Sequence, residues 1–215
     1  MLKIAAYHKP TTLVEAAALL AEDGRTIIAG GTDLLVNPRY MVGVREVVDL
    51  ALNAEVVLVG TNGERVVPLD NFFVGPAQSV RERELISELR IPLVDSDDLR
   101  GGFYKIGRTA EDISMVNAAA TLKIQGGTIT RARLVLGAVA PVPLRVTRAE
   151  EALAGQLATE ETFQRAAELV RDEVRPITDH RATAAYRRKM SSVTAVRALR
   201  QAAGLAPQGE EWRHA

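Results

Sequence analysis

The sequence predicts an α+β protein in which a strand-rich body is followed by amphipathic helices. Three observations support this class: a strand pair joined by Asn62-Gly63, a longer pair joined by Gly126-Gly127, and a C-terminal part rich in helix signals. Asn-Gly and Gly-Gly supply the positive φ angles that tight hairpins need. Thr followed by acidic residues marks a helix start. We therefore expect antiparallel pairing in the body and helices at the end.

The first region is expected to contain one helix and several short strands. The helix begins after Thr12, which precedes Glu15 by three residues as in a capping box. The expected strands are 25–29, 45–50, 55–60, 65–69 and 84–91. The last of these ends at Pro92, as an edge strand does. Residues 71–76 are expected to form a loop or a short turn, and the region ends near Val94.

The second region is expected to form one antiparallel sheet followed by helices. Residues 95–102 are polar and glycine-rich, which indicates a boundary or a surface loop. The expected strands are 103–108, 115–124 and 128–139, and the expected helices are 147–153, 159–174 and 182–203. Thr147 and Thr159 are the expected caps of the first two helices. The basic run from Arg187 to Lys189 is expected on a solvated helix face, and binding of an anion is the alternative.

A glycine-rich segment between apolar runs is the strongest candidate for a ligand site. It reads Ala29-Gly30-Gly31-Thr32-Asp33-Leu34 and follows the expected strand at 25–29. Adjacent glycines let backbone N–H groups converge on one anion, and Thr32 adds a hydroxyl donor, so the segment can cradle a phosphate. An ordinary strand-to-helix turn, with Thr32 or Asp33 as the N-cap, is the alternative.

Composition excludes several classes of function. Lys+Arg and Asp+Glu both number 27, so the net charge is zero and we expect no nucleic-acid partner. The chain has no cysteine, so any thiolate metal site or cysteine-bound iron–sulfur cluster must lie on a partner. No run is long and apolar enough for a membrane span or a signal peptide, and we expect a cytoplasmic protein.

A phosphate-binding transferase is another reading of the glycine segment, and it would need a general base nearby. His8, His180 and His214 are the only histidines, and none has an evident nucleophile beside it. No catalytic residue is therefore proposed from spacing, and no metal ligands are expected.

The motifs, in order, resemble the FAD-binding medium subunit of the xanthine dehydrogenase and aerobic carbon monoxide dehydrogenase family of molybdenum hydroxylases. The matching pieces are Tyr7…Pro10, Ala29-Gly30-Gly31-Thr32-Asp33-Leu34-Leu35, the hairpin region 53–76, Glu84…Ile91-Pro92, Phe103-Tyr104-Lys105…Arg108…Asp112, Leu136-Gly137-Ala138-Val139-Ala140…Pro143…Arg145, and Asp179-His180-Arg181…Tyr186-Arg187. Their order over nearly the whole chain makes the resemblance specific.

The resemblance implies a fold, a cofactor and site residues. Residues 1–94 would form a truncated vanillyl-alcohol-oxidase-like (PCMH-type) FAD-binding domain, residues 100–205 a small α+β C-terminal domain, and residues 206–215 a polar tail. The FAD pyrophosphate would be wrapped by Ala29, Gly30, Gly31, Thr32, Asp33 and Leu34. Ile86 would give the flavin an apolar contact, and the ammonium of Lys105 would line the site. Ordinary strand packing of Ile86 and surface pairing of Lys105 are the alternatives.

The resemblance also implies partners. Electrons would come from a [2Fe-2S] small subunit supplied by a molybdenum-cofactor large subunit, and would pass to NAD, quinone or oxygen. Hydroxylation itself would belong to the large subunit. The absence of cysteine agrees with clusters that lie on another chain.

One departure from the family pattern lies between Leu50 and Asn53. Family members carry several tens of further residues there, including a second pyrophosphate segment of the Thr-Ile-Gly-Gly-Asn kind, whereas this chain joins the two flanks directly. Two hypotheses follow: a flavin-carrying redox subunit, or a shortened structural or assembly subunit with weak or no FAD binding.

Overall fold

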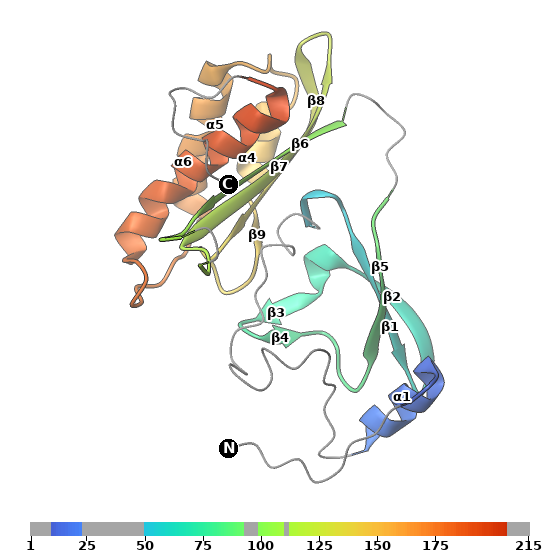
Figure 1. Ribbon diagram of the computed structural model, residues 1–215. Coiled ribbons are helices and arrows are strands. Elements are labelled where there is room, and N and C mark those ends of the chain that lie inside the picture. Colours follow the sequence, from blue (N-terminus) through green and yellow to red (C-terminus); the bar gives the residue numbers. More distant parts are fainter. Residues whose placement is uncertain (1–9, 23–49, 93–98, 110–111, 206–215) are drawn as a thin grey trace. The chain divides into compact units, whose positions relative to one another are not determined.

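The chain divides into two compact units in the computed structural model, which describes residues 10–22, 50–92, 99–109 and 112–205 (Figure 1). Unit 1 consists of Met1–Val42 and Asn53–Ile91, and unit 2 consists of Gly43–Leu52 and Pro92–Ala215. A short internal stretch of chain thus belongs with the C-terminal unit rather than with its sequence neighbours.

Unit 1 is built on a three-stranded antiparallel sheet and one helix. Helix α1 spans Leu13–Ala21, and the sheet has the order β2-β1-β5, with β1 at Glu55–Gly60, β2 at Gly63–Pro68 and β5 at Leu85–Arg90. The Thr12 hydroxyl accepts from the Glu15 backbone N–H at 3.2 Å, which confirms the expected cap. The Glu15 carboxylate reaches back one residue further, to the N–H of Thr11 at 2.9 Å. Strand β5 lies at an edge, as expected from Pro92.

The segment after β2 is more ordered than the sequence indicated. A short 3₁₀ helix, η1 (Leu69–Asn71), leads into two paired strands, β3 (Phe73–Gly75) and β4 (Gln78–Ser79). The loop or short turn expected at 71–76 was therefore wrong at residues 73–75, which form β3. Phe72 is buried and its ring meets that of Phe73 edge to face at 5.0 Å between centroids. This aromatic anchor orders a segment whose short strands carry no periodic signal.

Two strands expected in the first region fall almost entirely outside the described residues. The strand at 25–29 lies outside the described residues, as does the strand at 45–50 except for its last residue. That residue, Leu50, is helical together with Ala51, so the expected strand end was wrong. Their carbonyl oxygens accept hydrogen bonds from Arg133 and Thr121 of unit 2, a tertiary influence that local pattern cannot reveal.

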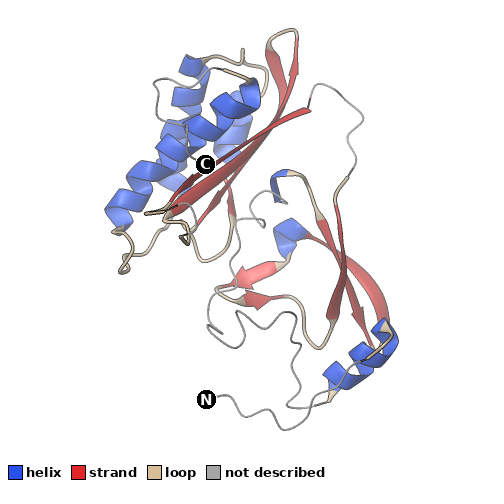
Figure 2. Ribbon diagram, viewed as in Figure 1, coloured by secondary structure: helices blue, strands red, loops and turns tan. Residues whose placement is uncertain are grey.

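Unit 2 is a four-stranded antiparallel sheet with three helices gathered on one face (Figures 1 and 2). The sheet order is β6-β7-β8-β9, formed by Leu99–Ile106, Val116–Gln125, Thr128–Gly137 and Leu144–Arg145. The helices are α4 (Thr147–Leu153), α5 (Glu160–Glu173) and α6 (Ala184–Ala203). Gly126 and Gly127 turn β7 into β8 with φ angles of 57° and 80°. The antiparallel sheet and the helical C-terminal part confirm the predicted α+β class.

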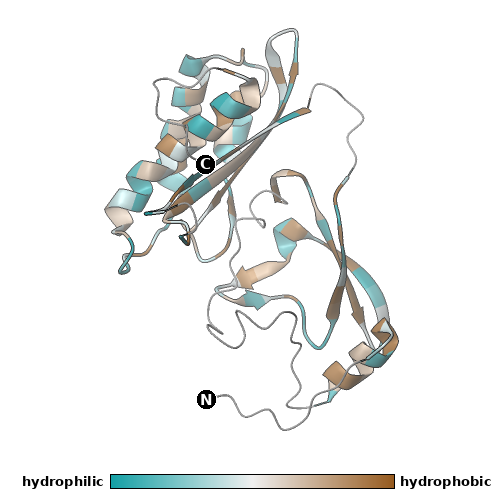
Figure 3. Ribbon diagram, in the orientation of Figure 1, coloured by the Kyte–Doolittle hydropathy of each residue, from teal (hydrophilic) through white to brown (hydrophobic). Residues whose placement is uncertain are grey.

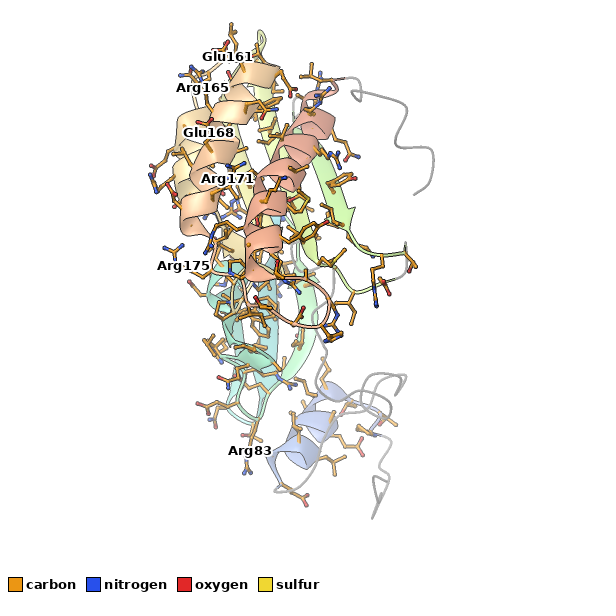
Figure 4. The ribbon with its side chains drawn as sticks, turned by 90° about the vertical axis from the view of Figure 1, so that its left-hand side faces the viewer. Arg83, Glu161, Arg165, Glu168, Arg171 and Arg175 are labelled. Atoms are coloured by element: carbon orange, nitrogen blue, oxygen red, sulfur yellow. The ribbon has the colours of Figure 1, made fainter. Side chains whose placement is uncertain are left out.

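The core of unit 2 lies between the sheet and the helices. Alternate residues of β7 and β8 face it, and the largest buried side chains include Leu122, Ile129, Leu134, Leu136, Phe163 and Leu199. Polar and apolar residues alternate along the helices (Figure 3). Four charged side chains lie along one side of α5, namely Glu161, Arg165, Glu168 and Arg171 (Figure 4). Its opposite side is buried, as expected for an amphipathic helix.

Two of the helix starts and one helix end behave as the sequence predicted. Thr159 caps α5 through the Thr162 N–H at 3.3 Å, and Gly204 ends α6 with a φ of 71°. The capping box expected at Thr147 was wrong, since Val146 is the N-cap of α4 and makes no side-chain bond. The Glu150 carboxylate instead accepts from the Leu134 N–H at 3.0 Å and pairs with Arg145. Glu150 thus ties α4 to the sheet.

A glycine in β6 sets the approach of α6 to the sheet. A Cβ built on Gly102 would lie 2.0 Å from the Ala198 carbonyl oxygen and 2.7 Å from the Ala202 nitrogen. The loop expected at 95–102 was therefore wrong at its end, where residues 99–102 belong to β6. Gly102 is required by close backbone packing rather than by a turn.

The substitution Gly102→Ala should destabilise unit 2 strongly, because the new methyl group meets helix backbone that cannot move aside. We expect a loss of about 3 kcal/mol or more in the free energy of unfolding, measured by urea denaturation. Gly101→Ala is the matched control, since its Cβ would lie 4.0 Å from the nearest atom. Equal effects of the two substitutions would contradict this account of the α6 contact.

Candidate functional site

The site residues expected from the sequence fall into three places. The glycine segment Ala29–Leu34 lies outside the described residues, so the structure adds nothing to that prediction. Ile86 belongs to unit 1, and Lys105 belongs to unit 2.

Ile86 presents an apolar side chain on the surface of unit 1. It lies on the edge strand β5 and is 51% exposed. The strand pairing shifts register beside it, between Val57 and Leu58 of β1. A β-bulge of this kind redirects the side chains next to it. The exposure argues against ordinary core packing and leaves Ile86 available for an apolar contact.

Lys105 is held at the end of β6 by a short turn. Its Nζ donates to the Asp112 carbonyl oxygen at 2.8 Å. The Asp112 side chain in turn accepts from Arg108 Nε at 2.9 Å, and this hydrogen bond is the main reason that the pKa of Asp112 lies below its usual value. A Cβ on Gly107 would approach the Thr109 carbonyl oxygen to 2.9 Å, so the turn is tight. The hydrogen bond to Asp112 therefore fixes the position of the Lys105 ammonium.

A polar row crosses the sheet beside Lys105. Lys105 pairs with Asn117 of β7, and Asn117 pairs with Gly137 of β8, so their side-chain positions share the face opposite the helices. Asn117 is 5% exposed, and its Oδ1 has no hydrogen-bond partner among the described residues. The buried Ser114 Oγ, just before β7, also lacks one. Unpartnered buried polar atoms are uncommon and call for a physical reason.

The sequence analysis did not single out Ser114 or Asn117. The available signal was a lone amide in a run of small and apolar residues, Val116 to Ala120, where the strand pattern favours apolar side chains. Spacing alone cannot show that the Asn117 oxygen is buried and unpaired. That information comes from the neighbouring strands.

The far end of the same sheet face binds an earlier part of the chain. Thr121 Oγ1 donates to the Ala51 carbonyl oxygen at 2.9 Å, and Arg133 Nη1 donates to that of Leu50 at 2.6 Å. Residues 50–51 are thereby attached to unit 2. Polar groups on this face thus divide into a satisfied set at Thr121 and Arg133 and an unsatisfied set near Lys105.

A buried arginine organises the end of the sheet where Lys105 lies. The side chain of Arg187 on α6 is 4% exposed, so the solvated position expected for the basic run was wrong at this residue. Its guanidinium donates to the carbonyl oxygens of Met115 and Ala138 at 2.5 and 3.1 Å, and to Asp179 Oδ1 at 2.8 Å. Burying this charge requires these partners, which the sequence pattern of an amphipathic helix does not reveal.

Asp179 supplies the counter-charge for Arg187. It also accepts hydrogen bonds from the backbone N–H groups of Arg181 and Ala182, at 2.9 and 3.1 Å. Burial alone would raise the pKa of Asp179, but the hydrogen bonds from Arg187 and the backbone outweigh it and hold that pKa well below its usual range. Within the motif Asp179-His180-Arg181…Tyr186-Arg187, Asp179 and Arg187 therefore form an ion pair that links α6 to the loop before it. We call this ion pair the clasp.

Replacing Asp179 with Asn should destabilise unit 2 by about 3 kcal/mol at neutral pH, because Arg187 loses its buried counter-charge. Since the folded-state pKa is depressed, the stabilisation by Asp179 is present above about pH 4 and is lost as the pH falls toward the folded-state value. The free energies of unfolding of the wild type and of Asp179→Asn, measured by denaturation, should therefore converge as the pH falls. Asp172→Asn is the control, because Asp172 is exposed and 3.9 Å from Arg148. A pH-independent difference would contradict the prediction.

The part of the chain that the structure describes has no candidate metal centre and no candidate membrane-spanning helix. Within it, no group of His, Cys, Asp or Glu side chains is placed to hold a metal ion. Among the same described residues, no helix is long and apolar enough to cross a membrane.

Comparisons with known proteins place this architecture among flavoprotein subunits of molybdenum-containing dehydrogenases. A family model described as "CO dehydrogenase flavoprotein C-terminal domain" matches residues 102–202. A second, "FAD binding domain in molybdopterin dehydrogenase", matches residues 46–94. The two matches follow one another and together cover most of the chain. Residues 46–94 and 102–202 thus match the FAD-binding and C-terminal domains of this family, whose named members include a carbon monoxide dehydrogenase medium chain and a xanthine dehydrogenase FAD-binding subunit, as the sequence motifs predicted.

Individual relatives agree with this family. The chain is 32% identical over 154 residues to the carbon monoxide dehydrogenase medium chain of Hydrogenophaga pseudoflava, covering 71% of this chain and 53% of the relative. It is 28% identical over 158 residues to the glyceraldehyde dehydrogenase medium chain of Sulfolobus acidocaldarius, covering 73% and 56%. The chain thus spans about half the length of the relatives it matches.

Solved structures show the same fold. A carbon monoxide dehydrogenase from Hydrogenophaga pseudoflava superposes with a TM-score of 0.70 at 34% identity, over 73% of this chain and 55% of the other. The reconstituted enzyme from Oligotropha carboxidovorans gives a TM-score of 0.70 at 29% identity, over 75% and 56%. These matches confirm the expected fold class, and the family descriptions confirm FAD as the family's cofactor.

The polar row near Lys105 fits a flavin in its chemistry. The ring of a flavin carries carbonyl oxygens and an N–H group along one edge, and it needs both donors and acceptors from the protein. Lys105 offers a donor, while Asn117 Oδ1 is an acceptor that has no partner in the described structure. Burying a donor or an acceptor lowers the stability of the fold unless a hydrogen-bonding partner is present.

Proposed function

We propose that this chain binds FAD and acts as the electron-transfer subunit of a molybdenum hydroxylase complex. The observation that carries the proposal is the ordered match of two family models, for a FAD-binding domain and for its C-terminal companion, along one chain. The relatives named as medium chains and FAD-binding subunits support the same role.

Specific residues are assigned to the cofactor in this proposal. Ala29, Gly30, Gly31, Thr32, Asp33 and Leu34 wrap the pyrophosphate through their backbone N–H groups. Ile86 gives the flavin ring an apolar contact, for which its exposure leaves it available. Lys105 places an ammonium beside the ring, where positive charge favours the electron-rich reduced form. When bound, FAD supplies the capacity to accept two electrons and release them singly or together.

The proposed division of the chain follows these roles. Residues 1–94 form the FAD-binding domain and residues 100–205 the C-terminal domain, with a polar tail at 206–215. The partners are a [2Fe-2S] small subunit and a molybdenum-cofactor large subunit, and the acceptor is NAD, quinone or oxygen. The lack of cysteine requires that the clusters lie on another chain. A cytoplasmic location is proposed with these partners.

The internal shortening bears on how tightly FAD is held. The chain joins residues 50–53 directly, where the family carries a second glycine-rich pyrophosphate segment. We propose that the remaining glycine segment and the Lys105 region retain the cofactor, with weaker affinity than in longer relatives. Fewer backbone donors on the diphosphate are the physical reason.

The purified chain should acquire flavin absorbance between about 350 and 500 nm after incubation with FAD and desalting, and dithionite should bleach it. Lys105→Met should weaken FAD binding about tenfold, because a charged hydrogen-bond donor is removed. Fluorescence titration measures the dissociation constant. Lys123→Met is the matched control, since Lys123 lies at the far end of the same sheet face.

A folded wild-type chain that retains no flavin would contradict the proposed function. The shortened structural or assembly subunit would then be the better description. Circular dichroism on the same sample shows whether the chain is folded.

A further inference from the structure

The side-chain oxygen of Asn117 is an acceptor for which the fold provides no donor. Asn117 lies in β7, is 5% exposed, and its Oδ1 makes no hydrogen bond within the described structure. A polar atom left in this state costs stability, and native proteins retain few of them. The unpaired Oδ1 of Asn117 therefore points to a ligand that donates a hydrogen bond to it and is not part of the fold.

The surroundings of Asn117 narrow the kind of partner. Its cross-strand neighbour Lys105 is half-buried and donor-only, and its other neighbour Gly137 has no side chain. Residues paired across antiparallel strands have Cβ atoms about 5 Å apart. The row therefore presents a donor and an acceptor side by side, next to a position with no side chain. A planar group with alternating acceptors and donors along one edge has the matching pattern.

We propose that Asn117 binds the pyrimidine edge of the flavin ring, accepting a hydrogen bond from its N3–H while Lys105 donates to the neighbouring carbonyl oxygen. This inference rests on the proposed function and adds a binding residue to it. The flavin edge reads carbonyl, N–H, carbonyl, which is the complement of the Lys105 and Asn117 pair. No other described residue supplies the missing donor to Asn117 Oδ1.

The substitution Asn117→Leu tests the proposal through two changes of opposite sign. Leu keeps the branching at Cγ and has no acceptor, so the free chain should become more stable, by about 2 to 4 °C in thermal unfolding. Its affinity for FAD should fall about fivefold, as expected for one lost hydrogen bond. A side chain that serves only the fold would not produce this combination.

Thr121→Val is the matched control on the same strand and sheet face. The Thr121 hydroxyl already donates to the Ala51 carbonyl oxygen at 2.9 Å. Its loss should lower the unfolding temperature and leave FAD affinity unchanged. The two substitutions therefore separate stability from cofactor binding in both directions.

Two further probes locate the contact on the ring. ADP shares the pyrophosphate part of FAD, so its affinity should be the same in wild type and Asn117→Leu. FAD methylated at N3 cannot donate to Asn117, so the wild type should bind it about fivefold more weakly than FAD, and Asn117→Leu should bind both alike. The wild-type comparison does not depend on the folding of any variant.

The outcomes distinguish this inference from the proposed function. If wild type binds FAD and Asn117→Leu binds it equally well, the Asn117 contact is refuted and the proposed function stands. A lower unfolding temperature for Asn117→Leu, or equal wild-type affinity for FAD and its N3-methyl form, also refutes the contact. If the wild type binds neither FAD nor its N3-methyl form, the proposed function fails and the inference fails with it.

Discussion

The hydrogen bonds of the buried Arg187 guanidinium hold together the end of the unit 2 sheet that carries Lys105 and Asn117. The guanidinium joins α6 to the carbonyl oxygens of Met115 and Ala138, where β7 begins and β8 has just ended, and to Asp179 in the loop before α6. A buried cation is tolerated only with such partners. Because the same strand ends carry Lys105 and Asn117, the clasp also fixes the frame in which a ligand would be recognised.

The two faces of the unit 2 sheet have different physical tasks. The helix-covered face is apolar and supplies the core, with Gly102 allowing α6 to approach closely. The opposite face carries polar side chains. Those of Thr121 and Arg133 donate hydrogen bonds to carbonyl oxygens of residues 50–51, whereas the Oδ1 of Asn117 has no partner among the described residues. Stability therefore comes mainly from one face, while the other retains the polar atoms that can recognise a ligand.

The connection between residues 50 and 53 coincides with a boundary between the two units. Residues 43–52 group with unit 2, whereas residue 53 onward returns to unit 1. Asn53 adopts a φ of 62°, a left-handed conformation that Asn tolerates better than most residues. The positive φ at this point is thus compatible with the local sequence, and the family match continues through it from residue 46 to 94.

The sequence by itself determined the α+β class, the Gly126-Gly127 hairpin, the caps at Thr12 and Thr159, and the family, because turn chemistry, capping and ordered motifs are local properties. It also singled out Lys105 through the family resemblance. Only the tertiary structure decided that Gly102 belongs to a strand, that Arg187 is buried, and that the Oδ1 of Asn117 has no partner among the described residues. These properties depend on atoms brought together from distant parts of the chain, so no local pattern encodes them.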